Sequence, residues 1–258
     1  MKILKKYPYI LLLELLLAAI VVILSACFDA PDSTIDESSN KRIKILVFSK
    51  TKGFRHKSIE KGVSRLKELG KTKNFDVEHS EDSGLFTTNN LNQYNAVVFL
   101  STSGDILDEP QQKAFEQYIK DGGGFMGIHS ATDTEYDWPW YNGLVGAYFL
   151  NHPKQQKATI EILNKDHPST SHLPNQWERF DEWYNYKSIS EDINVLANLD
   201  ESTYEGGANG ENHPIAWYHE YDGGKAFYTG GGHTDASYDE PLFLDHLYGG
   251  LMYVTGEK

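Results

Sequence analysis

Apolar runs and amphipathic segments alternate through the first half of the folded region, and this alternation leaves few architectures open. Strand-like runs occupy residues 43–49, 75–79, 95–101 and 124–129. Between them, helices are predicted over about residues 58–69, with Ser58 as the N-cap, and over 109–120. Strands without a polar face must be covered on both sides. The sequence therefore predicts an α/β fold in which helices cover both faces of a mostly parallel sheet.

The second half of the chain contains shorter strand-like runs and fewer helical patterns. Further strands are predicted at residues 158–163, 183–186, 194–197, 215–219 and 225–229. The last two flank Tyr221-Asp222-Gly223-Gly224, a sequence typical of a hairpin turn. A final helix is predicted over about residues 241–254, and it closes the same domain.

The N-terminal segment has the composition of a secretory signal. Three lysines precede an apolar run at residues 10–26, which is interrupted only by Glu14 and ends in Leu24-Ser25-Ala26-Cys27. This ending is similar to a bacterial lipobox, in which the cysteine is acylated. We therefore expect residues 1–27 to be a lipoprotein signal peptide and Cys27 to be the lipidated residue, with palmitate among its acyl groups. A plain transmembrane anchor is the alternative, although about 17 apolar residues are at the short limit for spanning a bilayer.

Three regions follow from this composition. After the signal, residues 28–42 are rich in Asp, Ser, Glu, Thr and Pro and are predicted to be a flexible tether, and residues 43–258 form one domain. Export to the periplasm or cell surface, with membrane attachment through the lipid anchor, is the expected localisation. Cys27 is the only cysteine, so the folded region has no disulfide and no cysteine nucleophile.

The charge of the chain and its glycine runs exclude several kinds of partner. The formal net charge is -13, and this argues against binding to nucleic acid. The run Gly122-Gly123-Gly124 precedes a strand, whereas a dinucleotide-binding fingerprint follows one, so no nucleotide cofactor is expected. The 16 tyrosines and 5 tryptophans suit sugar rings, although core packing accounts for most of them. A small carbohydrate is the expected partner.

Histidines follow several of the predicted strands. Arg55 and His56 come after the first strand, His129 after the fourth, and His233 after the last one. Ligands of open parallel sheets bind at the carboxyl ends of the strands. These side chains are therefore expected to meet at one rim, with Glu182 as the acid. The full set of candidates is Arg55, His56, His129, His152, Glu182, Tyr184, His213, Trp217 and His233.

Six short motifs resemble those of the ThuA-like, or trehalose-utilisation, family. They occur in the family's order, and the resemblance covers about residues 43–254. The motifs are Gly53-Phe-Arg-His56, Gly127-Ile-His129, Gly146 followed by His152-Pro153, Asp181-Glu-Trp-Tyr184, His213-Pro-Ile-Ala-Trp217 and Gly232-His233. The resemblance implies a flavodoxin-like, three-layer fold of the class I glutamine amidotransferase type. It also implies a role in the breakdown of a disaccharide or its 3-keto derivative.

The resemblance also bears on the nucleophile. Amidotransferases of this fold carry a cysteine in a G-x-C-x-G elbow, and the corresponding stretch here is Gly127-Ile-His129-Ser-Ala131. Glutamine hydrolysis through a thioester is therefore not expected. Ser130 stands one position too late to replace the cysteine. A histidine at the elbow favours proton transfer or metal ligation instead.

Two chemistries fit the candidate residues. In the first, His129 and Glu182 form a proton-transfer pair and His56 and His233 assist catalysis. In the second, a divalent ion such as Zn²⁺ is held by a subset of His129, His152, Glu182 and His233, although no H-x-x-x-H pair occurs in the sequence. The predicted substrate-binding residues are Arg55, His152, Tyr184, His213 and Trp217. We expect an enzyme of the sugar isomerase, lyase or hydrolase type, and a non-catalytic sugar-binding lipoprotein is the alternative.

Overall fold

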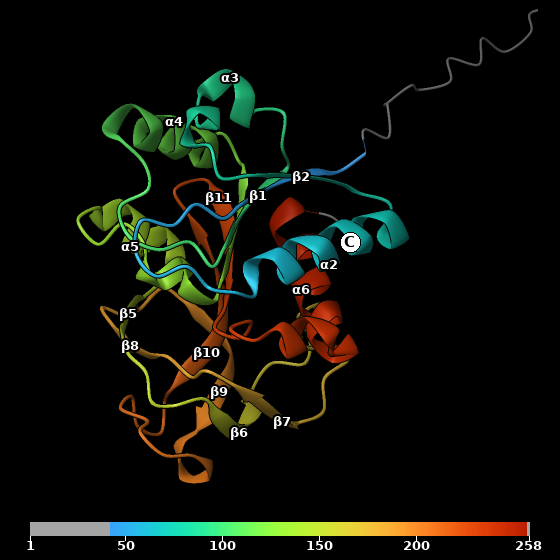
Figure 1. The fold of residues 1–258 in the computed structure, drawn as a ribbon, viewed down its shortest axis with the longest axis vertical. Helices are drawn as coiled ribbons and strands as arrows, with labels where there is room; N and C mark the ends of the chain where they lie inside the picture. Colours follow the sequence, from blue (N-terminus) through green and yellow to red (C-terminus); the bar gives the residue numbers. More distant parts are fainter. Residues whose placement is uncertain (1–41, 257–258) are drawn as a thin grey trace, which may run out of the picture. The chain divides into compact units, whose positions relative to one another are not determined.

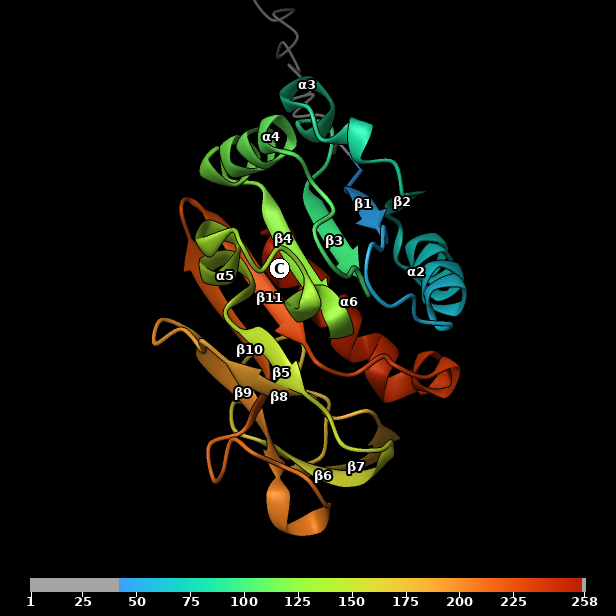
Figure 2. The ribbon, with the colours of Figure 1, turned by 60° about the vertical axis from the view of Figure 1, so that its left-hand side comes forward.

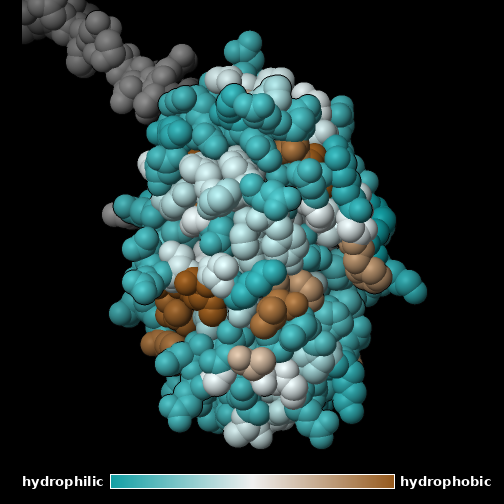
Figure 3. Space-filling model, turned by 90° about the vertical axis from the view of Figure 1, so that its left-hand side faces the viewer, coloured by the Kyte–Doolittle hydropathy of each residue, from teal (hydrophilic) through white to brown (hydrophobic). Residues whose placement is uncertain are grey.

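The computed structural model describes residues 42–256. The predicted signal peptide, Cys27 and nearly all of the predicted tether lie outside these residues. Among the helices of this range, none combines the length and hydrophobicity that crossing a bilayer requires. On the face shown in Figure 3, apolar surface is confined to a few separate patches in a hydrophilic surround.

Four parallel strands form the first half of the central sheet. They are β1 (Lys44–Phe48), β2 (Asp76–Ser80), β3 (Ala96–Leu100) and β4 (Gly124–Ile128), and they pair in the order β2-β1-β3-β4. β1, β3 and β4 are buried almost throughout because helices cover both of their faces. The α/β fold class predicted from the apolar runs is confirmed.

The helices form two layers, one on each side of the sheet (Figures 1 and 2). α2 (Ile59–Lys73) and α6 (Pro241–Thr255) pack on one face, where α6 contacts β4 and β11. α4 (Glu109–Lys120) and α5 (Pro139–Val145) cover the other face, and the short α3 (Thr88–Leu91) packs beside α4. The architecture is therefore the expected three layers.

The second half of the chain extends the sheet with antiparallel strands. β11 (Gly224–Thr229) pairs parallel with β4, and the sheet then continues through β10, β9, β6 and β7 in antiparallel pairs. The bounds of these four strands are Pro214–Tyr221, Asn194–Asp200, Gln156–Ile162 and Gln176–Asp181. β5 (Tyr148–Asn151) and β8 (Asn185–Lys187) form a separate two-stranded ribbon. The predicted hairpin is present, with Asp222 and Gly223 at positive φ in its turn.

The strand predicted at residues 183–186 overlaps β8, which covers Asn185–Lys187 and so begins two residues later. β7, which ends at Asp181, was not predicted. β7 is hard to recognise in the sequence because its inward residues include Arg179 and Asp181, while Phe180 points outward. A strand that buries charged residues has no apolar alternation to reveal it.

Strand register brings the polar loops of the site together. Ile128, the last residue of β4, pairs with Thr229, the last residue of β11. The residues that follow, His129 and Gly230, must therefore lie side by side. Ser58 adds a further tie: it occupies the N-cap position of α2, but its hydroxyl donates to the Gly232 carbonyl (3.0 Å) instead of capping the helix.

His246 of α6 should make the fold sensitive to acid. It is buried, its Nδ1 donates to the Ser169 carbonyl and its Nε2 accepts from the Thr229 hydroxyl. Burial lowers the pKa of His246 to about 3. Below pH 6.5 the unfolded chain takes up a proton that the folded chain refuses, so stability falls as the pH falls from 6.5 toward 3.

At about pH 5 this single group should cost about 2 kcal/mol of unfolding free energy relative to about pH 7.5. Urea unfolding at the two pH values should show a smaller loss for His246→Gln than for the wild type. The exposed His172 provides the control, and His172→Gln should keep the wild-type loss. An equal loss in His246→Gln and the wild type would contradict this account.

Candidate functional site

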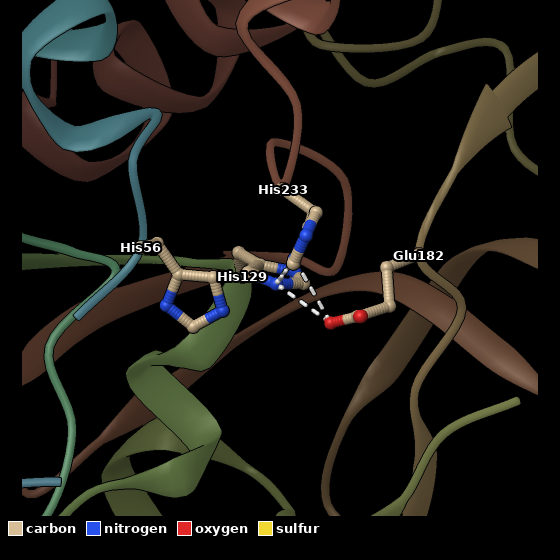
Figure 4. Close-up of side chains that lie close together, drawn as sticks. All are labelled: His56, His129, Glu182 and His233. Carbon is tan, nitrogen blue, oxygen red and sulfur yellow. Dashed lines mark hydrogen bonds and ion pairs between the residues drawn. The ribbon is translucent and has the colours of Figure 1, made fainter. Parts of the chain in front are cut away.

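Four side chains from distant parts of the chain converge at one rim of the sheet, as Figure 4 shows. Each offers one donor atom, and these atoms all lie within 4.8 Å of one another. In chain order, one of them follows each of the strands β1, β4, β7 and β11. We call them the His/Glu cluster: His56, His129, Glu182 and His233. The structure thus brings these four residues from the predicted set together.

His129 occupies a sharp turn directly after β4. Its φ is 52°, in the left-handed region that non-glycine residues rarely adopt, and it begins the 3₁₀ turn His129–Asp133. Its Nδ1 donates to the Gly230 carbonyl at 2.9 Å, which directs Nε2 to the centre of the cluster. Nε2 lies 3.1 Å from Nδ1 of His233 and 3.5 Å from Oε2 of Glu182.

His233 reaches the cluster from the glycine loop after β11. A Cβ on Gly231 would lie 2.4 Å from Nη1 of Arg179, and Gly232 has a φ of 110°. The absence of side chains on these glycines therefore lets the loop pack closely against Arg179 and turn into the site. Nδ1 of His233 lies 2.9 Å from Oε2 of Glu182, and its Nε2 lies 2.7 Å from the side-chain amide of Gln155. Gln155 was not among the predicted site residues.

Asp181 holds the two halves of the cluster in place. This fully buried carboxylate accepts hydrogen bonds from the backbone amides of Glu182, Gly232 and His233, at 2.8–3.1 Å. It also accepts from the Ser237 hydroxyl and lies 3.4 Å from the Arg179 guanidinium. One side chain thus positions both the end of β7 and the loop after β11. Asp181 lies in one of the six sequence motifs, but residue type and spacing predicted no role for it.

His56 is buried and neutral. Burial, together with the neighbouring His129 and His233, lowers the pKa of His56 to about 2. Its ring meets the rings of those two histidines edge-on, with centroids 4.7 and 5.0 Å away. Its nitrogens lie 3.3 Å from the Ser130 hydroxyl and 3.5 Å from the Tyr184 hydroxyl.

Glu182 is the anion of the cluster. Burial alone would raise its pKa, but hydrogen bonds and charges from His129 and His233 outweigh burial and lower the pKa. Its Oε2 faces these two histidines, and its Oε1 lies 3.3 Å from Nδ1 of His152. His152 therefore adjoins the cluster without belonging to it. The residue that completes the four donors is His56, which the sequence analysis did not include among the metal candidates.

The remaining predicted site residues support the cluster or lie beside it. Tyr184 is 3% exposed, and its ring packs at a tilt against that of His129, with the centroids 4.3 Å apart. A ring nitrogen of His213 lies 2.8 Å from the Tyr184 carbonyl, so His213 braces that tyrosine. Trp217 is 0% exposed and donates to the Val145 carbonyl. Arg55 lies on the surface, where it pairs with two glutamates.

The donor set matches that of a transition-metal site. Three imidazole nitrogens and one carboxylate oxygen are typical ligands of Zn²⁺. Each imidazole also contacts a polar group outside the cluster, as the histidine ligands of metal sites do. One proton shared among His129, His233 and Glu182 satisfies their mutual contacts, and a divalent cation can take the place of that proton. The cluster could therefore hold a metal ion.

Comparison with known proteins identifies relatives of the whole domain. The sequence model of the ThuA family, described as trehalose utilisation, matches residues 44–254. A ThuA-like protein from Bacteroides uniformis has a similar structure, with a TM-score of 0.72 and 24% identity over 83% of this chain and 91% of that chain. Its counterpart from Parabacteroides merdae gives 0.70 and 21% over 84% and 91%.

More distant structures share only the fold. A β-galactosidase from Bacillus circulans sp. alkalophilus matches with a TM-score of 0.56 and 15% identity, over 84% of this chain and 31% of that chain. No curated protein matches the sequence. The expected flavodoxin-like fold of the class I glutamine amidotransferase type is consistent with these findings.

Replacing Asp181 should destabilise the protein strongly. Asp181→Ala removes the acceptor of several buried hydrogen bonds and one partner of the buried Arg179. Loss of one member of a buried pair costs about 3–5 kcal/mol of unfolding free energy, which urea denaturation measures. Asp235→Ala, an exposed change in the same loop region, should cost less than about 0.5 kcal/mol. A loss below about 1 kcal/mol for Asp181→Ala would refute its positioning role.

Proposed function

This chain belongs to the ThuA family, described as trehalose utilisation, and on that premise we propose that it is an enzyme acting on a disaccharide or its 3-keto derivative. We further propose that the His/Glu cluster holds a divalent cation, with Zn²⁺ favoured by the donor set. The observation that carries this proposal is the convergence of four donor atoms, from four separate segments, within 4.8 Å. Burying these polar and charged side chains together costs free energy unless a bound partner compensates for it.

The protonation of the cluster supports cation binding. His56 is neutral and Glu182 is anionic. His129 carries a hydrogen on Nδ1, which it donates to the Gly230 carbonyl, so its Nε2 faces the cluster. Once the proton shared by His129, His233 and Glu182 is released, the lone pairs of these three groups face one another and can hold a cation. A divalent cation held there would polarise sugar oxygens and acidify a neighbouring C–H or O–H bond.

Exposure within the site indicates how substrate enters. His56 and His129 are buried, whereas His233 has 16% of its side chain exposed and His152 has 41%. A sugar would therefore approach from the side of His152 and His233. His152 contacts the outer oxygen of Glu182, so this pair is placed to carry a proton between the substrate and solvent.

This arrangement suits the chemistry of a 3-keto glycoside. Such a sugar has acidic protons next to its carbonyl, and removal of one leads to isomerisation or to elimination of the glycosidic oxygen. An imidazole beside a carboxylate can accept that proton near neutral pH. The absence of cysteine from residues 43–258 rules out the thioester route of the related amidotransferases.

We also propose that the protein works outside the cytoplasm on a lipid anchor. The support is the lysine-rich start, the apolar run and the Leu24-Ser25-Ala26-Cys27 sequence, all outside the described residues. The acidic net charge argues against a nucleic-acid partner. Processing can be checked by mass spectrometry of the mature chain, which should begin at an acylated Cys27, whereas Cys27→Ala should remain unprocessed.

Metal analysis tests the cation. The full-length protein, dialysed against a chelator and reloaded with Zn²⁺, should bind about one ion per chain, because the four donors form one site. Glu182→Gln should weaken zinc binding at least tenfold, since it removes the anionic donor. His219→Gln is the control, because this buried histidine of β10 pairs with Ala226, three residues before the end of β11, and bonds to the Gly143 carbonyl. Equal zinc affinity in Glu182→Gln and the wild type would exclude the proposed site.

An assay in D₂O tests the reaction. Trehalose and 3-ketotrehalose are incubated with zinc-loaded protein and followed by NMR for deuterium uptake and new products. We expect uptake next to the carbonyl of the keto sugar, and its loss in Glu182→Gln and after chelation. Binding without exchange or product would show that the protein captures sugar and does not transform it.

A further inference from the structure

Phe54 exposes an aromatic ring beside the His/Glu cluster. Its side chain is 66% exposed, more than that of any other large hydrophobic residue in the described part of the chain. The ring meets His56 edge-on, with the two centroids 4.9 Å apart. One edge of Phe54 is thus packed against a buried cluster member while most of the ring is open to solvent.

The backbone that carries Phe54 is held from both sides. On one side, the Ser103 hydroxyl donates to the Phe54 carbonyl at 2.7 Å, and the amides of Lys52 and Gly53 donate to the Ser103 carbonyl. On the other side, Arg55 ties the loop to α2 and to the end of β2. Its partners are Glu60 and Glu81, at 2.8 and 2.9 Å. The phenyl ring is therefore presented on an ordered loop.

A single exposed apolar side chain needs no explanation by itself. Phe54 differs because its loop is fixed and because it adjoins the cluster. Tyr184 and Trp217, the aromatic residues among the predicted substrate-binding residues, are both buried in the structure. The apolar C–H face of a pyranose ring would cover Phe54 while the hydroxyls on its edge reach the cluster.

We propose that Phe54 is the sugar-binding platform of the site and that it selects an uncharged pyranose. The selection for an uncharged ring rests on Arg55, the cation next to Phe54 in the sequence. Its guanidinium is already occupied by two carboxylates, so it does not offer a phosphate a free partner, and Glu60 and Glu81 would repel one. This inference deepens the proposed function and rests on it.

Equilibrium binding to the zinc-loaded, full-length protein tests the platform. Trehalose is titrated into the wild type, Phe54→Ala, Phe54→Trp and Leu163→Ala. Loss of the covered apolar surface should weaken trehalose binding about tenfold in Phe54→Ala. Phe54→Trp should restore binding to within about threefold of the wild type, because it keeps an aromatic face.

Leu163→Ala is the matched control. Leu163 is also exposed and apolar. It follows the last residue of β6 and lies about 20 Å along the strand from Gln156, the first residue of β6. It should bind trehalose as the wild type does. Because Phe54 is exposed, all variants should unfold at the same urea concentration as the wild type, which separates a binding defect from a folding defect.

The outcomes distinguish this inference from the proposed function. A wild type that binds neither trehalose nor 3-ketotrehalose would overturn both. A wild type that binds, with Phe54→Ala binding equally well, would overturn only the platform. Trehalose 6-phosphate should bind at least tenfold more weakly than trehalose, since it meets carboxylates. Equal or tighter binding of the phosphate would overturn the selection for an uncharged ring.

Discussion

The parallel pairing of β4 with β11 is the constraint on which the site depends. It joins the parallel half of the sheet to the antiparallel half, and its register sets Ile128 against Thr229. The two loops that carry His129 and His233 therefore start side by side. Asp181 then ties the end of β7 to the second of these loops through the backbone amides of Glu182, Gly232 and His233.

The turn after β4 holds His129 in the stretch that corresponds, by resemblance, to the cysteine elbow of the amidotransferases. His129 holds the left-handed backbone that places a side chain at the strand end, and the Gly230 carbonyl fixes which ring nitrogen faces inward. An imidazole in this place is a donor for a cation or a carrier of protons, where a thiol would be a nucleophile. The side chain at this turn therefore decides which chemistry is available there.

Much of the fold could be predicted because its first half follows simple rules. Apolar runs at β1, β3 and β4 and apolar faces on α2 and α4 are visible in the sequence. β7 was missed because Arg179 and Asp181 point inward, where Arg179 pairs with both Asp181 and Glu240. The predicted metal ligands included His152, whereas the structure places His56 among the four donors. Their spacing in the sequence carries no information about which ring turns into a shared centre.

The sequence by itself determined the fold class, the family and the histidines and glutamate that make the cluster, because apolar periodicity and residue type are local properties. The tertiary structure alone decided the tautomer of His129, the role of Asp181, the burial of Trp217 and the exposure of Phe54. These depend on strand register and on contacts between segments far apart in the chain, such as the bond from Ser58 to Gly232, which joins residues 174 positions apart. A chain's pattern shows which groups are available, and only packing sets which of their atoms face one another.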